Sequence, residues 1–181
     1  MTQLQERVSQ AYESLNLAAT DTLCRHFLLP YFHKWQLQES EIGLHIINRP
    51  SPDCVELVLN KEAQLAVVND YEGLRDNPQL EVTTLATIQD VFVGGPDYKG
   101  AGFFDQGRLL NEPILLLHKG SASRTFFDEV THGACRKPRF ELGSVDVLLD
   151  LVEINMGISM LPNHVVQQKM QEGSIVRIDT D

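Results

Sequence analysis

Two hydroxyl-bearing turns, far apart in the chain, are the features of this sequence best suited to chemistry. Thr20 and Thr22 follow a stretch in which apolar residues alternate, which is typical of a short buried strand. Ser121 and Ser123 follow a continuous apolar run in a similar way. A strand that turns tightly into a helix leaves the first backbone N–H groups of the helix without partners, and a small anion suits that place. The alternative is that Thr20 and Thr22 only cap their own helix.

The elements that must position these turns alternate between strand and helix. Residues 15–68 predict the order strand, helix, strand, helix, strand, with helices long enough for right-handed crossovers. In the first helix the spacing predicts one apolar face made of Leu23, Cys24, Phe27, Leu28, Tyr31 and Trp35. In the second helix Ser51 is predicted as the N-cap and Pro52 as the first helical residue.

The middle of the chain is rich in turns. Two strands are predicted at 80–84 and 90–93, joined by a connection suited to a hinge. Glycines are frequent in 94–107, and the Gly-Ala-Gly there does not open a helix as a nucleotide-binding pattern requires. This segment is therefore predicted as a flexible loop.

The second half repeats the strand–helix alternation. Helices are predicted after the first three of its strands, and Pro162 is expected at the first position of the last helix. The predicted strands are 114–117, 140–142, 157–161 and 174–178. The fold class is therefore α/β with two lobes, each presenting Ser- or Thr-rich turns at the strand ends, where open α/β sheets bind ligands.

Composition excludes several classes of protein. The 181 residues suffice for one ordinary domain or two small lobes, and 43% apolar with 22% charged residues is typical of a globular chain. No apolar run approaches the ~20 residues of a membrane span, and the polar start carries no export signal. Cys24, Cys54 and Cys135 are too few and too scattered for a disulfide framework, and two of them are expected in the core. A cytoplasmic protein with no membrane partner is expected.

Charge argues against direct binding to nucleic acid. The formal net charge is −10, and the densest basic group is only Arg136, Lys137 and Arg139. Phosphates would repel such a chain unless it carried a concentrated basic patch.

An enzyme is not expected either. The sequence has no G-x-S-x-G, H-E-x-x-H or P-loop motif and no paired Cys/His ligand set. Its six histidines are scattered, and His118 beside Lys119 is interpreted as a strand-end residue rather than a base. We therefore expect no metal and no cofactor.

The ordered series of segments resembles the effector-binding domain of LysR-type transcriptional regulators over residues 14–178. The segments are LAATDTLCRHFLLPYF, LHIINRPSPDCVELV, QLAVVND, ILLLHKGSASRTFFDEV and FELGSVDVLLDLVEINMGISMLP. The resemblance implies two Rossmann-like lobes joined by crossover strands, as in type II periplasmic binding proteins, with a small effector held in the cleft between them. It also implies a homodimer, or a tetramer in the full-length form.

Domain limits follow from the resemblance. Residues 1–13 match the remnant of a linker helix, 14–88 lobe I, 89–172 lobe II, and 173–181 the start of a return crossover to lobe I. The family's DNA-binding head would precede these residues and its final strand and helix would follow them. Without that final part, lobe I is expected to be less stable.

The resemblance also assigns effector-binding positions. They are Thr20, Thr22, Arg49, Ser51, Asn69, Ser121, Ser123, Ser144 and Asp146, and Lys119 is added to them for its positive charge. Hydroxyls and helix-start amides would donate to an anion, and Arg49, Lys119 and Arg124 would supply positive charge. Asp21 is left out because it would repel an anion.

Several of these positions allow plainer interpretations. Lys119 and Arg124 can be solvated surface charges, Ser144 a plain N-cap, and Asp146 a residue that only stabilises its helix dipole.

The leading hypothesis is a ligand-sensing domain of a transcriptional regulator that binds a small, anionic effector. It would couple ligand occupancy to oligomer geometry and to DNA binding by the helix-turn-helix domain. The alternatives are a solute-binding protein of a transport system and a dimerisation module with a vestigial cleft.

Overall fold

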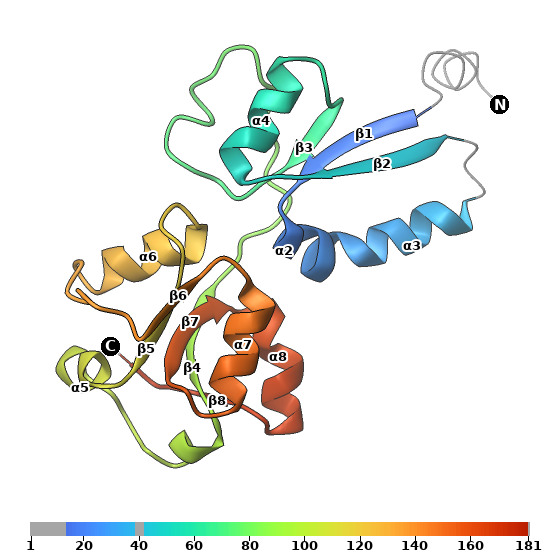
Figure 1. Ribbon diagram of the computed structural model, residues 1–181. Helices are drawn as coiled ribbons and strands as arrows, with labels where there is room; N and C mark the ends of the chain where they lie inside the picture. The colour runs from blue at the N-terminus through green and yellow to red at the C-terminus, as the bar shows by residue number, and fades with distance from the viewer. Residues whose placement is uncertain (1–13, 39–41, 181) are drawn as a thin grey trace. The chain divides into compact units, whose positions relative to one another are not determined.

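The computed structural model describes residues 14–38 and 42–180, which fall into two compact units, Met1–Thr83 and Thr84–Asp181 (Figure 1). The predicted linker-helix remnant at 1–13 lies outside the described residues. The predicted lobe boundary lies five residues later, between 88 and 89. Each unit has its own α/β architecture, as the alternating pattern predicts.

Unit 1 (Met1–Thr83) is built on a three-stranded parallel sheet of order β2-β1-β3. Its strands are β1 (Ser14–Ala19), β2 (Gly43–Asn48) and β3 (Leu65–Val67). β1 pairs with both neighbours, and its last three residues are buried. The carboxyl ends of all three strands therefore lie at one edge of the sheet.

The helix after β1 departs from the predicted regular pattern. It begins as α2 (Asp21–Leu23), passes through a π-helical turn, η1 (Cys24–Leu28), and continues as α3 (Leu29–Leu37). Because a π turn holds more residues than an α turn, it rotates the following residues about the helix axis. Tyr31, predicted on the buried face, is 55% exposed as a result.

The next helix, α4 (Ser51–Leu59), begins one residue earlier than predicted. Pro50 is its N-cap and Ser51 is its first residue, so Ser51 is not the cap. The Ser51 hydroxyl instead accepts a hydrogen bond from the backbone N–H of Asn69 (3.1 Å). Sequence reasoning missed this contact because it depends on where β3 ends, not on the helix itself.

The strand predicted at 80–84 is wrong. Residues 80–89 form no strand, and residues 83–89 are all exposed. A strand needs a neighbour to satisfy its backbone groups, and the described part of the chain places none beside this segment. The strand predicted next does form, as β4 (Asp90–Gly94).

Unit 2 (Thr84–Asp181) contains a five-stranded mixed sheet of order β6-β5-β7-β4-β8. Its other strands are β5 (Ile114–Leu117), β6 (Phe140–Leu142), β7 (Ile158–Pro162) and β8 (Val176–Arg177). β5 is parallel to β6 and β7, whereas β4 is antiparallel to β7 and β8. Residues 173–181, predicted to begin a return crossover to lobe I, thus include a strand that pairs within unit 2.

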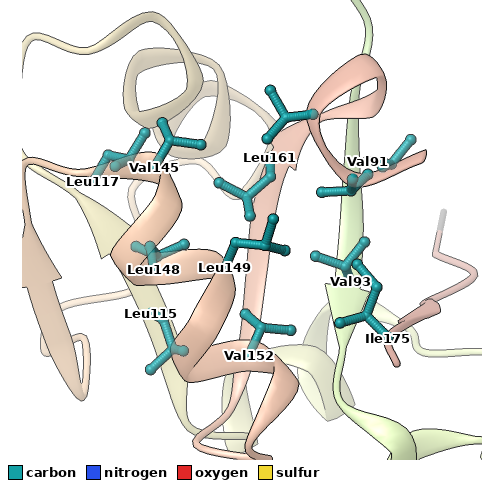
Figure 2. Close-up of a cluster of buried hydrophobic side chains, with 12 residues drawn as sticks. Val91, Val93, Leu115, Leu117, Val145, Leu148, Leu149, Val152, Leu161 and Ile175 are labelled. Carbon is teal, nitrogen blue, oxygen red and sulfur yellow. The ribbon is translucent and has the colours of Figure 1, made fainter. Parts of the chain in front are cut away.

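Helices cover both faces of this sheet. The helices are α5 (Gln106–Asn111), α6 (Ala122–Val130), α7 (Val145–Glu153) and α8 (Asn163–Glu172). One core cluster joins α7 and α8 to the sheet through Leu115 and Leu117, as Figure 2 shows. The other joins α5 and α6 to it through Ile114 and Leu116. Side chains of a strand point alternately to the two faces, so the continuous apolar run of β5 fills both cores.

The start of α8 and the segment 94–107 both differ from their predictions. Pro162 is not the first residue of α8 but the last residue of β7, and α8 begins at Asn163. The segment 94–107 is not a loose loop throughout. Phe104 within it is 1% exposed because its aromatic ring belongs to the second core cluster. The backbone N–H of Phe104 also donates to the carbonyl of Asp179 (2.8 Å).

The entry into β7 requires a glycine. Gly157 has φ of +154°, and a Cβ at this position would stand 2.1 Å from the carbonyl oxygen of Pro113. The same oxygen accepts a hydrogen bond from the N–H of Ile158 (2.8 Å). Only a residue without Cβ lets β7 approach β5 this closely.

Candidate functional site

The candidate residues of unit 1 gather at the carboxyl edge of its sheet. The N–H of Arg49 donates to the carbonyl of Ala19 (3.3 Å), which joins the end of β2 to the end of β1. The bond from Asn69 to Ser51 joins the end of β3 to the start of α4. The structure therefore brings four predicted positions, Thr20, Arg49, Ser51 and Asn69, to one edge of one unit.

The hydroxyls in unit 1 serve the fold as well. Oγ1 of Thr20 accepts a hydrogen bond from the N–H of Leu23 (3.3 Å), so Thr20 caps α2 as the alternative interpretation expects. Thr22 follows as the half-buried second residue of that helix. The exposed Arg49 donates through its guanidinium to the carbonyl of Asn48 (2.7 Å).

Two serine turns of unit 2 lie side by side. Ser121 caps α6 by accepting from the N–H of Arg124 (3.2 Å), and Ser144 caps α7 by accepting from the N–H of Val147 (3.3 Å). The N–H of His118, between β5 and Ser121, donates to the carbonyl of Leu142 at the end of β6 (3.0 Å). Two helix starts with capping hydroxyls thus meet at one edge of the sheet.

The charged candidates of this edge differ in exposure. Lys119 is exposed, and within the described part of the chain no ion pair of its ammonium is found. Asp146 is half-buried and lies in the first turn of α7, where a carboxylate stabilises the helix dipole. This edge of unit 2 thus carries an exposed positive charge at Lys119 and a half-buried carboxylate at Asp146.

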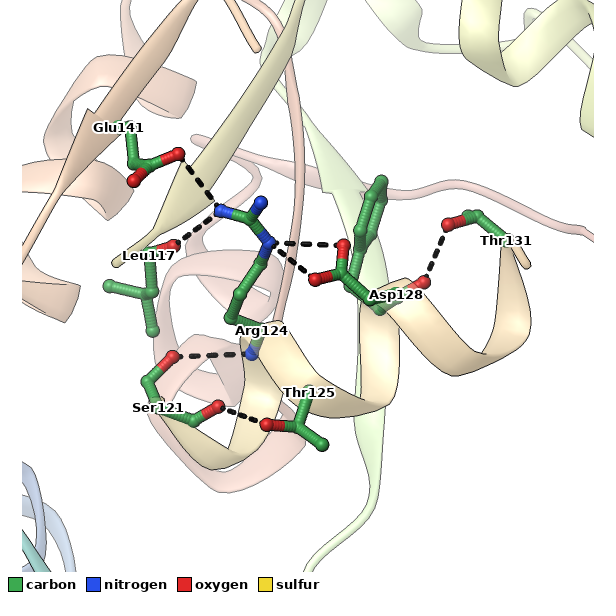
Figure 3. Close-up of polar contacts among 8 residues, drawn as sticks. Leu117, Ser121, Arg124, Thr125, Asp128, Thr131 and Glu141 are labelled. Carbon is green, nitrogen blue, oxygen red and sulfur yellow. Dashed lines mark hydrogen bonds and ion pairs between the residues drawn. The ribbon is translucent and has the colours of Figure 1, made fainter. Parts of the chain in front are cut away.

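Arg124 is not a solvated surface charge. Its side chain is 6% exposed and forms ion pairs with Asp128 (2.9 Å) and Glu141 (3.0 Å), drawn in Figure 3. The surface-charge interpretation fails for one reason. The carboxylate of Glu141 is brought to this helix by β6, and its distance along the chain hides that contact from local patterns.

Sequence reasoning missed Asp90 and His164, which belong to the same edge of unit 2. Asp90 begins β4 opposite Pro162, the residue before α8. Burial raises the pKa of Asp90. A hydrogen bond from the Ser123 side chain and the charge of His164 both lower this pKa, but burial outweighs them. Ser123 itself is buried, with 7% of its surface exposed, and its side chain is the hydrogen-bond partner of Asp90. No spacing in the sequence signals this cluster, since its members come from three separate elements.

Within residues 14–38 and 42–180, no group of three or more His, Cys, Asp or Glu side chains is arranged to hold a metal ion. No helix in the same ranges combines the length and apolar character that crossing a membrane requires.

Comparison with solved structures identifies the fold. The regulatory domain of AphB from Vibrio vulnificus matches with a TM-score of 0.70 at 17% identity, over 92% of this chain and 83% of that one. The regulatory domain of CcmR from Synechocystis PCC6803 in complex with 2-PG matches with a TM-score of 0.70 at 19% identity, over 93% and 81%. The effector-binding domain of QuiR in complex with shikimate matches with a TM-score of 0.72 at 15% identity, over 94% and 82%.

At these identities the likeness shows the fold, which is that of type II periplasmic binding proteins, as the sequence analysis expects. No curated protein sequence is similar enough to this chain to count as a match. The family profile described as the LysR substrate binding domain matches residues 9–181. Because this match covers nearly the whole sequence, the chain belongs to the LysR substrate-binding domain family.

Proposed function

We propose that this chain is the ligand-sensing part of a LysR-type transcriptional regulator and binds a small anionic effector. In unit 1 the proposed contacts are Thr20, Thr22, Arg49, Ser51 and Asn69. In unit 2 they are Lys119, Ser121, Ser123, Ser144 and Asp146. The regulator acts as a homodimer or tetramer, and it reaches DNA only through a helix-turn-helix domain outside this chain.

The observation that carries the proposal is the pair of capped helix starts at one edge of unit 2. The N-terminus of a helix presents unpaired N–H groups and the positive end of a dipole, and it attracts an anion. A serine hydroxyl that accepts a bond from its own helix still has a proton to donate. Ser121 and Ser144 can therefore cap their helices and hold an anion together.

The chemistry of the relatives' ligands supports an anion. QuiR is seen in complex with shikimate, which is a carboxylate, and CcmR in complex with 2-PG. Family membership also favours a sensor over a transport protein. The hydroxyl-rich turns suit either a carboxylate or an inorganic oxyanion, so both belong in the test.

Thermal unfolding with a panel of anions tests the proposal. Inorganic sulfate, inorganic phosphate, citrate and shikimate are added in turn to the full chain. An anion present at a hundred times its Kd should stabilise the folded state by ~2.7 kcal/mol. If no small anion stabilises the chain, the proposed effector class is wrong.

Two substitutions at Ser121 separate ligand binding from capping. Asp and Asn are caps as good as Ser, so Ser121→Asp and Ser121→Asn should both keep the stability of the free protein. The added carboxylate should repel an anion, so Ser121→Asp should abolish the stabilisation while Ser121→Asn retains most of it. Thr22→Val should weaken the stabilisation by the anion, because it removes a proposed effector contact of unit 1. Unchanged stabilisation in Ser121→Asp and Thr22→Val would show that these are not effector contacts.

A further inference from the structure

The guanidinium of Arg124 contacts two carboxylates and a backbone carbonyl. Nε donates to both carboxylate oxygens of Asp128 (3.0 and 2.9 Å). Nη1 donates to the carbonyl of Leu117 (3.1 Å) and to the carboxylate of Glu141 (3.0 Å), as Figure 3 shows. One buried group therefore contacts three different elements.

This group stays charged, but its charge is not available to a ligand. Burial lowers the pKa of Arg124, and hydrogen bonds to Glu141 and Asp128 more than compensate, so the pKa is raised overall. Two carboxylates against one guanidinium leave the cluster with one net negative charge. An anion gains nothing from approaching it.

The contacts of Arg124 enclose one turn of the chain. Leu117 is the last residue of β5, and Ser121 is the N-cap of α6, so residues 118–121 form the connection between them. The guanidinium donates to the carbonyl of Leu117, immediately before this turn. The backbone N–H of Arg124 donates to the hydroxyl of Ser121, at the end of the turn. Within the turn, the N–H of Ser121 donates to the carbonyl of His118 (3.2 Å).

We propose that Arg124 is a positioning residue for the effector site of unit 2. It does not touch the effector. It holds the 118–121 turn against β5 and β6, and thereby sets the places of Lys119 and Ser121. The relevance to ligand binding rests on the proposed function, whereas the effect on the turn does not.

Hydrogen exchange of the full chain tests the effect on the turn. Arg124→Lys keeps the charge but has no planar fork to bind Leu117, Asp128 and Glu141 together. Amides of residues 118–125 should exchange at least about tenfold faster, while amides of β7 change less than about threefold. An equal increase throughout unit 2 would indicate a purely structural role and overturn the proposal, as would no increase at the turn.

Thr131→Val is the matched control. Thr131 follows the last residue of α6 and is 2% exposed. Its hydroxyl donates to the carbonyl of Phe127 (2.7 Å). The substitution removes a buried hydrogen bond next to the same helix and should leave exchange at 118–121 as in the wild type. Glu141→Gln, which removes one ion pair without changing shape, should give a smaller selective increase than Arg124→Lys. Faster exchange of the turn in Thr131→Val would show that any loss at α6 loosens it, which overturns the proposal.

Inorganic sulfate is the probe for the link to ligand binding. If sulfate stabilises the wild type, Arg124→Lys should raise the Kd for sulfate at least about fivefold, whereas Thr131→Val should leave this Kd unchanged. Unchanged sulfate binding in Arg124→Lys overturns the positioning role. A wild type that no anion stabilises would refute the proposed function instead, and the exchange measurement alone would then decide the role of Arg124.

Discussion

At the scale of single residues, the hydroxyls of the candidate site serve the fold and remain available to a ligand. Thr20, Ser121 and Ser144 each accept one hydrogen bond from a helix N–H. Each hydroxyl can also donate one, which is what an anion requires. Capping and ligand binding are therefore compatible at these positions, and the two uses are separated only by variants that keep the cap.

Asp90 should make stability depend on pH. Its folded-state pKa is raised above the ordinary value of 3.8 by burial, so the folded protein holds a proton that the unfolded chain releases earlier. Stability from this group is fully present below pH 3.8 and is lost as the pH rises through the folded-state pKa. Relative to Asp90→Asn, the wild type should lose stability in urea unfolding measurements as the pH rises from below 3.8 through the folded-state pKa.

Ser123→Ala sharpens this test. The Ser123 hydroxyl lowers the pKa of Asp90, so its removal should raise that pKa further and widen the pH range over which stability is lost. A difference between wild type and Asp90→Asn that does not change with pH would show that Asp90 is ionised equally in both states.

At the scale of elements, α7 shows how one helix is divided between core and solvent. Its hydrophobic residues recur at helical spacing, and those of one face pack on the sheet through β5 and β7. Leu148 on that face is fully buried, whereas its neighbour Val147 is 51% exposed. The helix therefore offers a buried and an exposed apolar side chain in adjacent positions.

Truncation of these two neighbours should have very different effects. Leu148→Ala leaves a cavity in a closely packed core and should lower the free energy of unfolding by about 2–5 kcal/mol. Val147→Ala removes exposed methyl groups and should change it by less than about 0.5 kcal/mol. Chemical denaturation of both variants measures the difference. Similar losses would contradict the assignment of the buried face.

At the scale of the whole molecule, the two units have cores of different size. The clusters of unit 2 contain 12 and 8 buried residues, whereas those described in unit 1 contain 3 each. Stabilisation by the hydrophobic effect grows with the apolar area removed from water. Unit 2 should therefore be the more stable part.

Separate expression of the units measures this difference. Residues 84–181 alone should unfold cooperatively in a thermal melt, whereas residues 14–83 alone should show no cooperative transition. Limited proteolysis of the full chain should first cut within 83–89, where every residue is exposed. A cooperative melt of residues 14–83 alone would contradict the prediction.

The sequence by itself determined the features that depend on neighbouring residues. The strands Ile114–Leu117 and Phe140–Leu142 were predicted with the limits that the structure shows, because strand and cap signals are local. Thr20, Ser121 and Ser144 were recognised at helix starts for the same reason. The ordered series of such local patterns was also enough to identify the family.

Only the tertiary structure decided features that depend on residues far apart in the chain. The ion pair of Arg124 needs Glu141 from β6, the role of Ser51 needs the end of β3, and the raised pKa of Asp90 needs its burial in the folded chain. The strand predicted at 80–84 does not form for a related reason, since the described part of the chain places no partner strand beside it. Ion pairs, burial and strand pairing are interactions between distant segments, and their free energy exists only once folding has brought those segments together.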